Sequence, residues 1–285
     1  MNRRDFLKAA AKGIIVSGVA PSWAFAEPGK IAQTSLSQKN YEPYIKDYLY
    51  KIKNFNKDHQ GDIYLQGEKK KLLKSVVNRL KRLYQIVGHA DFSLLSFDEA
   101  LKIAENYSAI GCFSNNEIEF MEMTFYGDAD QFGFLGKKPL MQLTAYVPEK
   151  EIIKIPYSGN HLFKGLPLET YTKIKRVVGD QLILSSGVRS IMKQMLLFLN
   201  KAYMNHSNLS LASRSLAPPG YSYHGIGDFD VGQVGFGEGN FTENFITTDV
   251  YKKLEGLGYL TLRYPRENML GVRFEPWHVK VIADL

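Results

Sequence analysis

The chain has 285 residues, of which 45% are hydrophobic and 23% are charged. This composition is typical of a folded globular protein with a sizeable core and argues against disorder. The formal net charge of +7 is too mild to predict nucleic-acid binding, and no array of basic and aromatic residues favours it.

The first 26 residues have the pattern of an export signal. They open with "NRRDFLK", which holds an arginine pair, continue with a mildly apolar run, and end in "AFA", a small-residue cleavage site. Lys12 interrupts the apolar run, which is shorter than the roughly 20 residues of a membrane span. The pattern predicts a twin-arginine signal peptide over residues 1–26, and hence a periplasmic protein exported by the twin-arginine machinery. Without this segment the net charge is +4.

The chain contains a single cysteine, Cys112, so no disulfide can form within the chain and no thiolate zinc site or iron–sulfur cluster can be built. No dinucleotide-binding fingerprint is present either. The stretch "GFGEG" at 235–239 has the wrong glycine spacing for one. These absences argue against an exported redox-cofactor protein.

Residues 27–150 are predicted to form a mostly helical N-terminal extension of unknown role. The stretch "EKKKLLKSVVNRLKRLYQI" at 68–86 has apolar residues at helical spacing. Ser96, followed three residues later by Glu99, is typical of a helix start. Farther along, "LMQLTAYV" at 140–147 is strand-like.

Residues 151–285 are predicted to form a second domain that mixes helices and strands. We expect an α+β fold in which a small antiparallel sheet carries the functional site and helices pack to one side. The methionines and leucines of the second helix lie on one face and indicate core packing. The expected helices are 170–178 and 188–203, and the expected strands are 181–185, "YLTLRY" (259–264) and "GVRFEP" (271–276).

Two of the six histidines stand in contexts that suggest chemistry. His224 lies in "PPGYSYHGIGDFDVG" at 218–232, close to Asp228 and Asp230. The glycines there let the backbone bend, so a histidine and an aspartate can converge on one point. Imidazole nitrogen and carboxylate oxygen are suitable zinc ligands. The alternative is a Gly-Asp turn with a surface histidine.

The other histidine, His278, lies in "RFEPWHVKV" at 273–281. Pro276 disfavours a helix at Glu275, and the alternation that follows predicts a strand with Trp277 facing the core. The proline therefore marks a bend, which can bring the Glu275 carboxylate beside a metal held by His278. Two histidines and one aspartate leave a tetrahedral zinc position open for water, and a nearby glutamate can act as its general base.

Three stretches in order resemble the VanY-type D-alanyl-D-alanine carboxypeptidases over about residues 150–285. They are "SGVRSIMKQ" (186–194), "SYHGIGDFDVG" (222–232) and "EPWHVKV" (275–281). The resemblance implies a zinc enzyme that trims peptidoglycan stem peptides, with L,D-carboxypeptidases, lysostaphin-type endopeptidases and Hedgehog domains as relatives.

The resemblance also implies residue roles. His224, Asp230 and His278 would bind zinc, and Glu275 would be the general base. Arg189 matches the arginine of the family's S-G-Y-R-S motif and would stabilise the oxyanion. Two further residues match positions that line the substrate site near its terminal carboxylate: Ser222 and Gln194.

The sequence departs from the family pattern at two points. The family motif S-x-H-x-x-G-x-A-x-D has six residues between histidine and aspartate, whereas five separate His224 from Asp230. A shortened loop explains this, with Asp228 as the alternative metal ligand. Val188 replaces the tyrosine of S-G-Y-R-S.

The resemblance leaves the specificity open among D,D-carboxypeptidase, L,D-carboxypeptidase and crosslink endopeptidase activity. The competing function is a non-catalytic zinc-containing protein that binds the cell wall. A binding protein has no need for a general base, so Glu275 favours the enzyme.

Overall fold

The structure is a computed structural model that describes residues 42–258 and 261–282. The predicted signal peptide and the residues up to 41 lie outside the described part. The described residues from 43 onwards group into one compact unit. None of the helices in the described ranges is long and apolar enough to cross a membrane.

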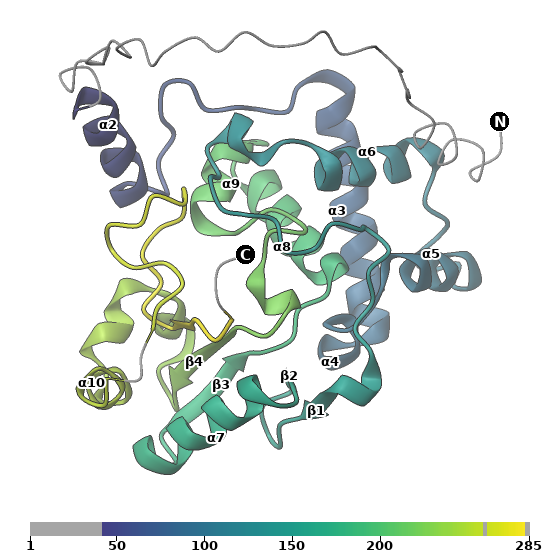
Figure 1. The fold of residues 1–285 in the computed structure, drawn as a ribbon. Helices are drawn as coiled ribbons and strands as arrows, with labels where there is room; N and C mark the ends of the chain where they lie inside the picture. Colours follow the sequence, from purple (N-terminus) through teal and green to yellow (C-terminus); the bar gives the residue numbers. More distant parts are fainter. Residues whose placement is uncertain (1–41, 259–260, 283–285) are drawn as a thin grey trace, which may run out of the picture. The chain divides into compact units, whose positions relative to one another are not determined.

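In the described residues, five α-helices precede residue 150 (Figure 1): α2 (Glu42–Lys53), α3 (Gly67–Val87), α4 (His89–Phe92), α5 (Phe97–Asn106) and α6 (Asn115–Tyr126). The predicted start at Ser96 is confirmed, because its hydroxyl accepts from the Glu99 amide in a capping box. The apolar face predicted for 68–86 is confirmed too, since Leu73, Val76 and Leu80 of α3 are fully buried.

Helix α3 packs against α8 (Ile191–Met204), which is followed by α9 (Leu209–Ser215). Met192, Met195 and Leu199 of α8 share one hydrophobic core with the buried face of α3, so the methionine–leucine stripe is core, as predicted. This core joins residues from both sides of position 150. The division into 27–150 and 151–285 stays a prediction.

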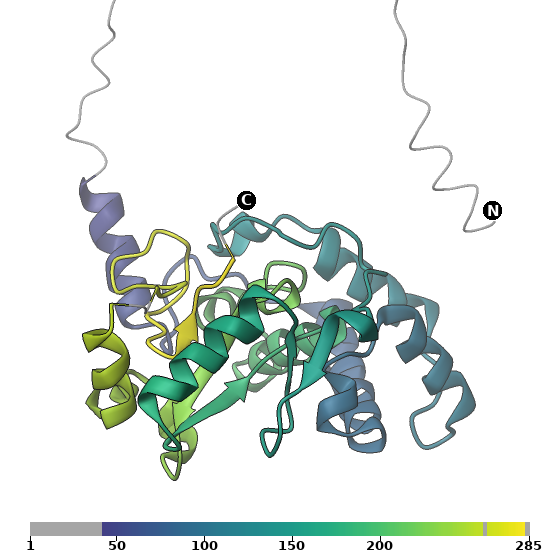
Figure 2. The same ribbon diagram turned by 60° about the horizontal axis from the view of Figure 1, so that its bottom comes forward.

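In the part of the chain that the structure describes, two small antiparallel sheets complete the fold. Strand β1 (Ile152–Lys154) pairs with β2 (His161–Phe163), and the second sheet has the order β3-β4-β5, formed by Leu182–Ser186, Phe229–Gln233 and His278–Val279. Helix α7 (Leu166–Val178) lies alongside β2 and β3, and α10 (Asp249–Gly256) packs near α7 and β4 (Figures 1 and 2). The predicted mixture of helices with a small antiparallel sheet is confirmed. Short 3-10 helices span Ala129–Phe132 (η2), Glu149–Glu151 (η3), Tyr223–Gly225 (η4), Gly237–Phe241 (η5) and Glu243–Thr247 (η6).

Three predicted strands are wrong in the described residues. "LMQLTAYV" and "GVRFEP" are irregular, and of "YLTLRY", whose first two residues lie outside the described part, only Leu262 forms a bridge, to Val279. In "GVRFEP" the Arg273 amide donates to the carbonyl of residue 214 and the Glu275 amide donates to that of residue 264. Because these two partners belong to different segments, no strand ladder can form.

Two helix boundaries also differ from the prediction. Helix α7 begins at Leu166, earlier than the expected 170, because Pro167 is tolerated in the first turn. Helix α8 begins at Ile191 and not at 188. Ser190 caps it by accepting from the Lys193 amide, while the Val188 amide donates to the His161 carbonyl.

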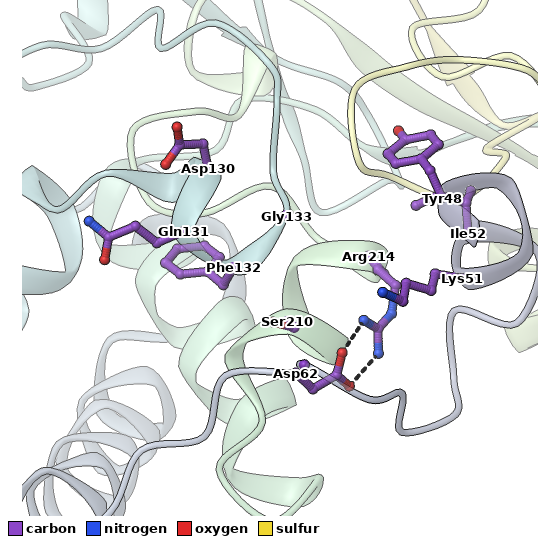
Figure 3. A pocket seen from close by; sticks show the side chains of 11 residues that line it. Tyr48, Lys51, Ile52, Asp62, Asp130, Gln131, Phe132, Gly133, Ser210 and Arg214 are labelled. Atoms are coloured by element: carbon purple, nitrogen blue, oxygen red, sulfur yellow. Dashed lines mark hydrogen bonds and ion pairs between the residues drawn. The ribbon is translucent and has the colours of Figure 1, made fainter. Parts of the chain in front are cut away.

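A buried ion pair fixes the segment between α2 and α3 to α9. Asp62 receives a bidentate contact from Arg214, with Oδ1 2.7 Å from Nη1 and Oδ2 2.8 Å from Nη2, at the wall of a cavity of about 200 Å³ (Figure 3). Arg214 also donates to the Lys57 carbonyl. Burial raises the pKa of Asp62, but hydrogen bonds from Arg214 and Asn208 outweigh it and leave the pKa below its ordinary value.

We expect Asp62→Asn to lower the free energy of unfolding at pH 7 by about 3 kcal/mol, since it leaves a buried guanidinium without its counter-charge. The folded-state pKa of Asp62 is lowered, so this stabilisation is present above the unfolded pKa of about 3.9 and is lost as the pH falls through and below it. Urea unfolding of the wild type and of the Asp62→Asn variant, from pH 7 to pH 3, measures the difference in their free energies of unfolding. A gap that stays constant over this range would contradict the assigned charge pair.

Candidate metal centre

Three elements bring His224, Asp230 and His278 together. His224 lies in η4, Asp230 in β4 and His278 in β5, where the strand register pairs it directly with Asp230. Phe229 and Val231 point into the hydrophobic core, so strand alternation turns Asp230 to the opposite face. The ring centroids of the two histidines are 4.6 Å apart.

The three side chains are buried and offer ligand atoms that all lie within 4.8 Å of one another. Among the described residues, these three side chains are the group that could hold a metal ion, and they are called the metal-ligand group below. Asp230 Oδ1 lies 3.2 Å from His224 Nε2 and 3.7 Å from His278 Nδ1. Tetrahedral zinc with bonds of about 2.0–2.1 Å separates its ligand atoms by roughly 3.3 Å, so the spacing fits this ion.

Hydrogen bonding also favours a cation between these atoms. His224 Nδ1 lies 2.9 Å from the Gly187 carbonyl, which can only accept, so the proton of the neutral ring is on Nδ1. The lone pair of His224 Nε2 then faces Asp230 Oδ1, a buried oxygen with no hydrogen-bond donor. Two facing lone pairs repel unless a positive charge lies between them. The donor set of two imidazole nitrogens and one carboxylate oxygen therefore fits zinc.

Gly187 is required at its position by its surroundings. A Cβ atom there would come within 2.0 Å of the His161 carbonyl oxygen. Any side chain would therefore push residue 187 away and displace its own carbonyl, which orients His224. Sequence reasoning did not single out this glycine, although it belongs to the first of the three motifs.

The surroundings of the cluster shift the pKa values of its side chains in different directions. Burial lowers the pKa of His278, but Asp228, Glu275 and Asp230 together raise it to about 9. Burial and Arg189 lower the pKa of His224, which is neutral at pH 7. Burial raises the pKa of Asp230, but His224, His278 and Arg189 hold it below its ordinary value. Metal binding would therefore compete with a proton on His278.

Glu275 lies beside the cluster because the chain turns at Pro276. The His278 amide donates to the Glu275 carbonyl at 3.2 Å, which closes a turn over residues 275–278. This turn places Glu275 Oε2 3.1 Å from His278 Nδ1. The bend that the sequence predicts at the proline is present, and the carboxylate faces the same nitrogen as Asp230.

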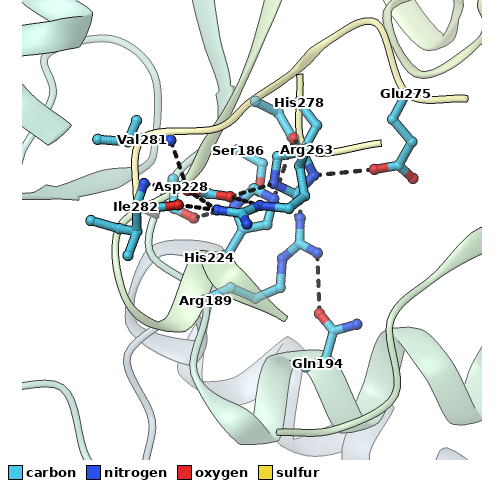
Figure 4. Close-up of polar contacts among 12 residues, drawn as sticks. Ser186, Arg189, Gln194, His224, Asp228, Arg263, Glu275, His278, Val281 and Ile282 are labelled. Carbon is cyan, nitrogen blue, oxygen red and sulfur yellow. Dashed lines mark hydrogen bonds and ion pairs between the residues drawn. The ribbon is translucent and has the colours of Figure 1, made fainter. Parts of the chain in front are cut away.

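Arg189 lies between β3 and α8 with its guanidinium held on several sides (Figure 4). Its Nη2 donates to Ser186 Oγ at 2.9 Å and lies 3.4 Å from Asp230 Oδ2, while Nη1 donates to Gln194 Oε1 at 3.1 Å. Gln194 Nε2 in turn donates to the Ala217 carbonyl. Ser222, the residue before η4, is buried close to His224 in the chain.

Asp228 and Asp230 lie on different sides of the His278 ring. Asp230 faces Nδ1, whereas Asp228 Oδ2 lies 3.3 Å from Nε2. The Asp228 carboxylate is already bound by Arg263, a residue that sequence reasoning missed because no motif contains it. The geometry thus places Asp230, and not Asp228, in the metal-ligand group.

Comparison with known proteins agrees with the three motifs. Residues 168–284 match the family model of VanY, described as D-alanyl-D-alanine carboxypeptidase. Among solved structures, "VanYB in complex with D-Alanine-D-Alanine" aligns with 53% of this chain and 86% of its own, at 21% identity and a TM-score of 0.37. No curated protein matches the chain. Residues 168–284, which contain every predicted site residue, are therefore a domain of the VanY D-alanyl-D-alanine carboxypeptidase family.

Proposed function

We propose that this protein is a zinc-dependent peptidase that removes a terminal D-alanine from peptidoglycan stem peptides in the periplasm, after export by the twin-arginine pathway. The family match supports the peptidase class. The observation that carries the proposal is the convergence of His224 Nε2, Asp230 Oδ1 and His278 Nδ1, with Glu275 beside the last of them.

His224, Asp230 and His278 would hold the zinc ion. A zinc ion bound by these residues would supply a Lewis acid and would lower the pKa of water towards about 7. Two of the three ligands are imidazoles, which suit zinc better than calcium or magnesium. Three protein ligands leave the coordination open, as in catalytic rather than structural zinc sites.

Glu275 would act as the general base. Its carboxylate lies at the edge of the ligand group, 3.1 Å from His278 Nδ1, so it can take a proton from the attacking water and later donate it to the leaving amine. Its backbone position is fixed, because the Glu275 amide donates to the Tyr264 carbonyl at 3.0 Å.

Arg189 would stabilise the negative charge that develops on the scissile carbonyl oxygen. Ser186, Gln194 and Asp230 hold its guanidinium next to the ligand group before substrate binds. A preorganised donor of this kind commonly lowers the activation free energy of the reaction by about 3 kcal/mol. Gln194 would act on the substrate through Arg189, and Ser222 would contact the terminal carboxylate.

We expect the protein to release D-alanine from stem pentapeptides, and mass spectrometry of penta- and tetrapeptides incubated with the protein tests this. A chelator should abolish the reaction and added zinc should restore it. Cleavage of the tetrapeptide alone would identify an L,D-carboxypeptidase, and cleavage of crosslinked dimers an endopeptidase. A protein that binds zinc and cleaves none of them would be a non-catalytic cell-wall binding protein.

We expect Glu275→Gln to lower the rate of hydrolysis by about 10²–10⁴-fold, because general-base catalysis commonly contributes this much. Zinc content should stay near one ion per chain, since Glu275 is not in the ligand group. Rate measurement together with metal analysis checks both. Glu238→Gln changes an exposed glutamate of η5 and is the matched control. Wild-type activity in the Glu275 variant would refute the assigned base.

Zinc should also stabilise the fold. At a free zinc concentration of 100 times the Kd, the free energy of unfolding of the wild type should rise by about 2.7 kcal/mol. Asp230→Asn removes a ligand and should lose this gain. Asp249→Asn changes an aspartate whose side chain is 85% exposed, and it should keep the gain. Denaturant unfolding with and without zinc measures the free energy of unfolding of the wild type and both variants. A gain in Asp230→Asn equal to that of the wild type would contradict the ligand assignment.

A further inference from the structure

A lysine of α8 lies against two aromatic rings from helices outside the matched residues 168–284. The ammonium of Lys193 is 4.7 Å from the centre of the Tyr84 ring in α3 and 5.9 Å from the centre of the Phe92 ring in α4. The two rings pack edge to face, with 5.4 Å between their centroids. The N-terminal helices therefore build the surroundings of this cation.

The same helices hold the start of α8, which follows Arg189. The Ser190 amide donates to the Ser93 carbonyl at 2.8 Å, and Ser190 Oγ donates to the Phe92 carbonyl at 3.3 Å. Lys193 stands four residues after Arg189, whose guanidinium lies against the metal-ligand group. The contacts of Ser190 thus fix Lys193 close to the arginine that would meet the scissile carbonyl.

Lys193 forms no ion pair with a carboxylate of the described residues. Burial lowers the pKa of Lys193 to about 8, and the charge of Arg189 lowers it further, whereas an acidic partner would raise it. The side chain is half-buried, where an uncompensated charge is costly and contacts with aromatic rings offset only part of that cost. An anion beside the ammonium would remove the remainder.

We propose that Lys193 binds a side-chain carboxylate of the stem peptide, on the part of the peptide that precedes the scissile bond. The inference rests on the proposed peptidase function and gives that function a specificity-determining residue. Ser222 is assigned to the terminal carboxylate and Gln194 faces Arg189, whereas Lys193 faces α3 and α4. Because an extended peptide advances about 3.5 Å per residue, a side chain one or two residues before the bond is within reach of a cation near Arg189.

The test compares two stem pentapeptides that differ by one charge. Diaminopimelate as the third residue carries a free side-chain carboxylate, and its amidated form keeps the shape without the charge. Calorimetry measures the Kd of both peptides for protein that carries Glu275→Gln, so that neither peptide is cleaved during the titration. We expect the free form to bind about 10-fold more tightly, because hydrogen bonds to charged groups are commonly worth this much.

Variants of Lys193 in the same Glu275→Gln background assign this preference. Lys193→Met removes the charge and keeps an unbranched side chain on the two rings, so both peptides should bind with equal affinity. Lys193→Glu reverses the charge and should favour the amidated form. Lys201→Met is the matched control, since it changes another half-buried lysine of α8, in the last turn, whose pKa burial also lowers. It should keep the 10-fold preference.

The ratio of the two Kd values separates the proposed role from a structural one, because lost packing would weaken both peptides alike. Equal affinity while Lys193 is intact, an undiminished preference in Lys193→Met or Lys193→Glu, or a lost preference in Lys201→Met would each overturn the proposal. Binding of neither peptide would overturn it too. Either Lys193 variant is sufficient if the other does not fold.

Failure of this inference is distinct from failure of the proposed function. A protein that hydrolyses both peptides and binds them equally well remains a peptidase, and the role of Lys193 is then wrong. A protein that prefers the free carboxylate through Lys193 but cleaves neither peptide, even with Glu275 intact, is not the proposed peptidase, and the role of Lys193 in binding stands.

Discussion

The pairing of β4 with β5 is the constraint on which the site depends. It sets Asp230 opposite His278, while the neighbours Phe229, Val231, Trp277 and Val279 fill the core on the other face. A slip of one residue in this register would turn the polar side chains into the core and the apolar ones out. The hydrophobic effect thus fixes the positions of two candidate metal ligands. Because side chains alternate along a strand, burial of the apolar residues on one face directs Asp230 and His278 to the other face, where they meet.

Electrostatic balance is the second requirement. Asp228, Asp230 and Glu275 all surround one imidazole in a buried region, where uncompensated charge is costly. Arg263 balances the first of these carboxylates and Arg189 lies against the second. The remaining negative charge raises the pKa of His278 to about 9. If the cluster binds a metal as proposed, its affinity for that metal should rise with pH.

The sequence predicts the parts of the site that local pattern determines. Helical spacing in 68–86, the cap at Ser96 and the bend at Pro276 depend on neighbouring residues, and all are present. The three motifs identify the residues that converge. The strand predicted at "GVRFEP" is wrong because its backbone bonds go to two separate segments, which only the tertiary fold reveals. Arg263 and Gly187 were missed for the same reason, since their roles arise from contacts with residues distant in the chain.

Anomalous diffraction at the zinc absorption edge, from crystals of the zinc-loaded protein, tests the central claim most directly. We expect one strong peak bonded to His224 Nε2, Asp230 Oδ1 and His278 Nδ1, with Asp228 still paired to Arg263 behind the ring. No peak between these three atoms, or a zinc ion bound by Asp228 in place of Asp230, would contradict the metal centre and the peptidase proposed from it.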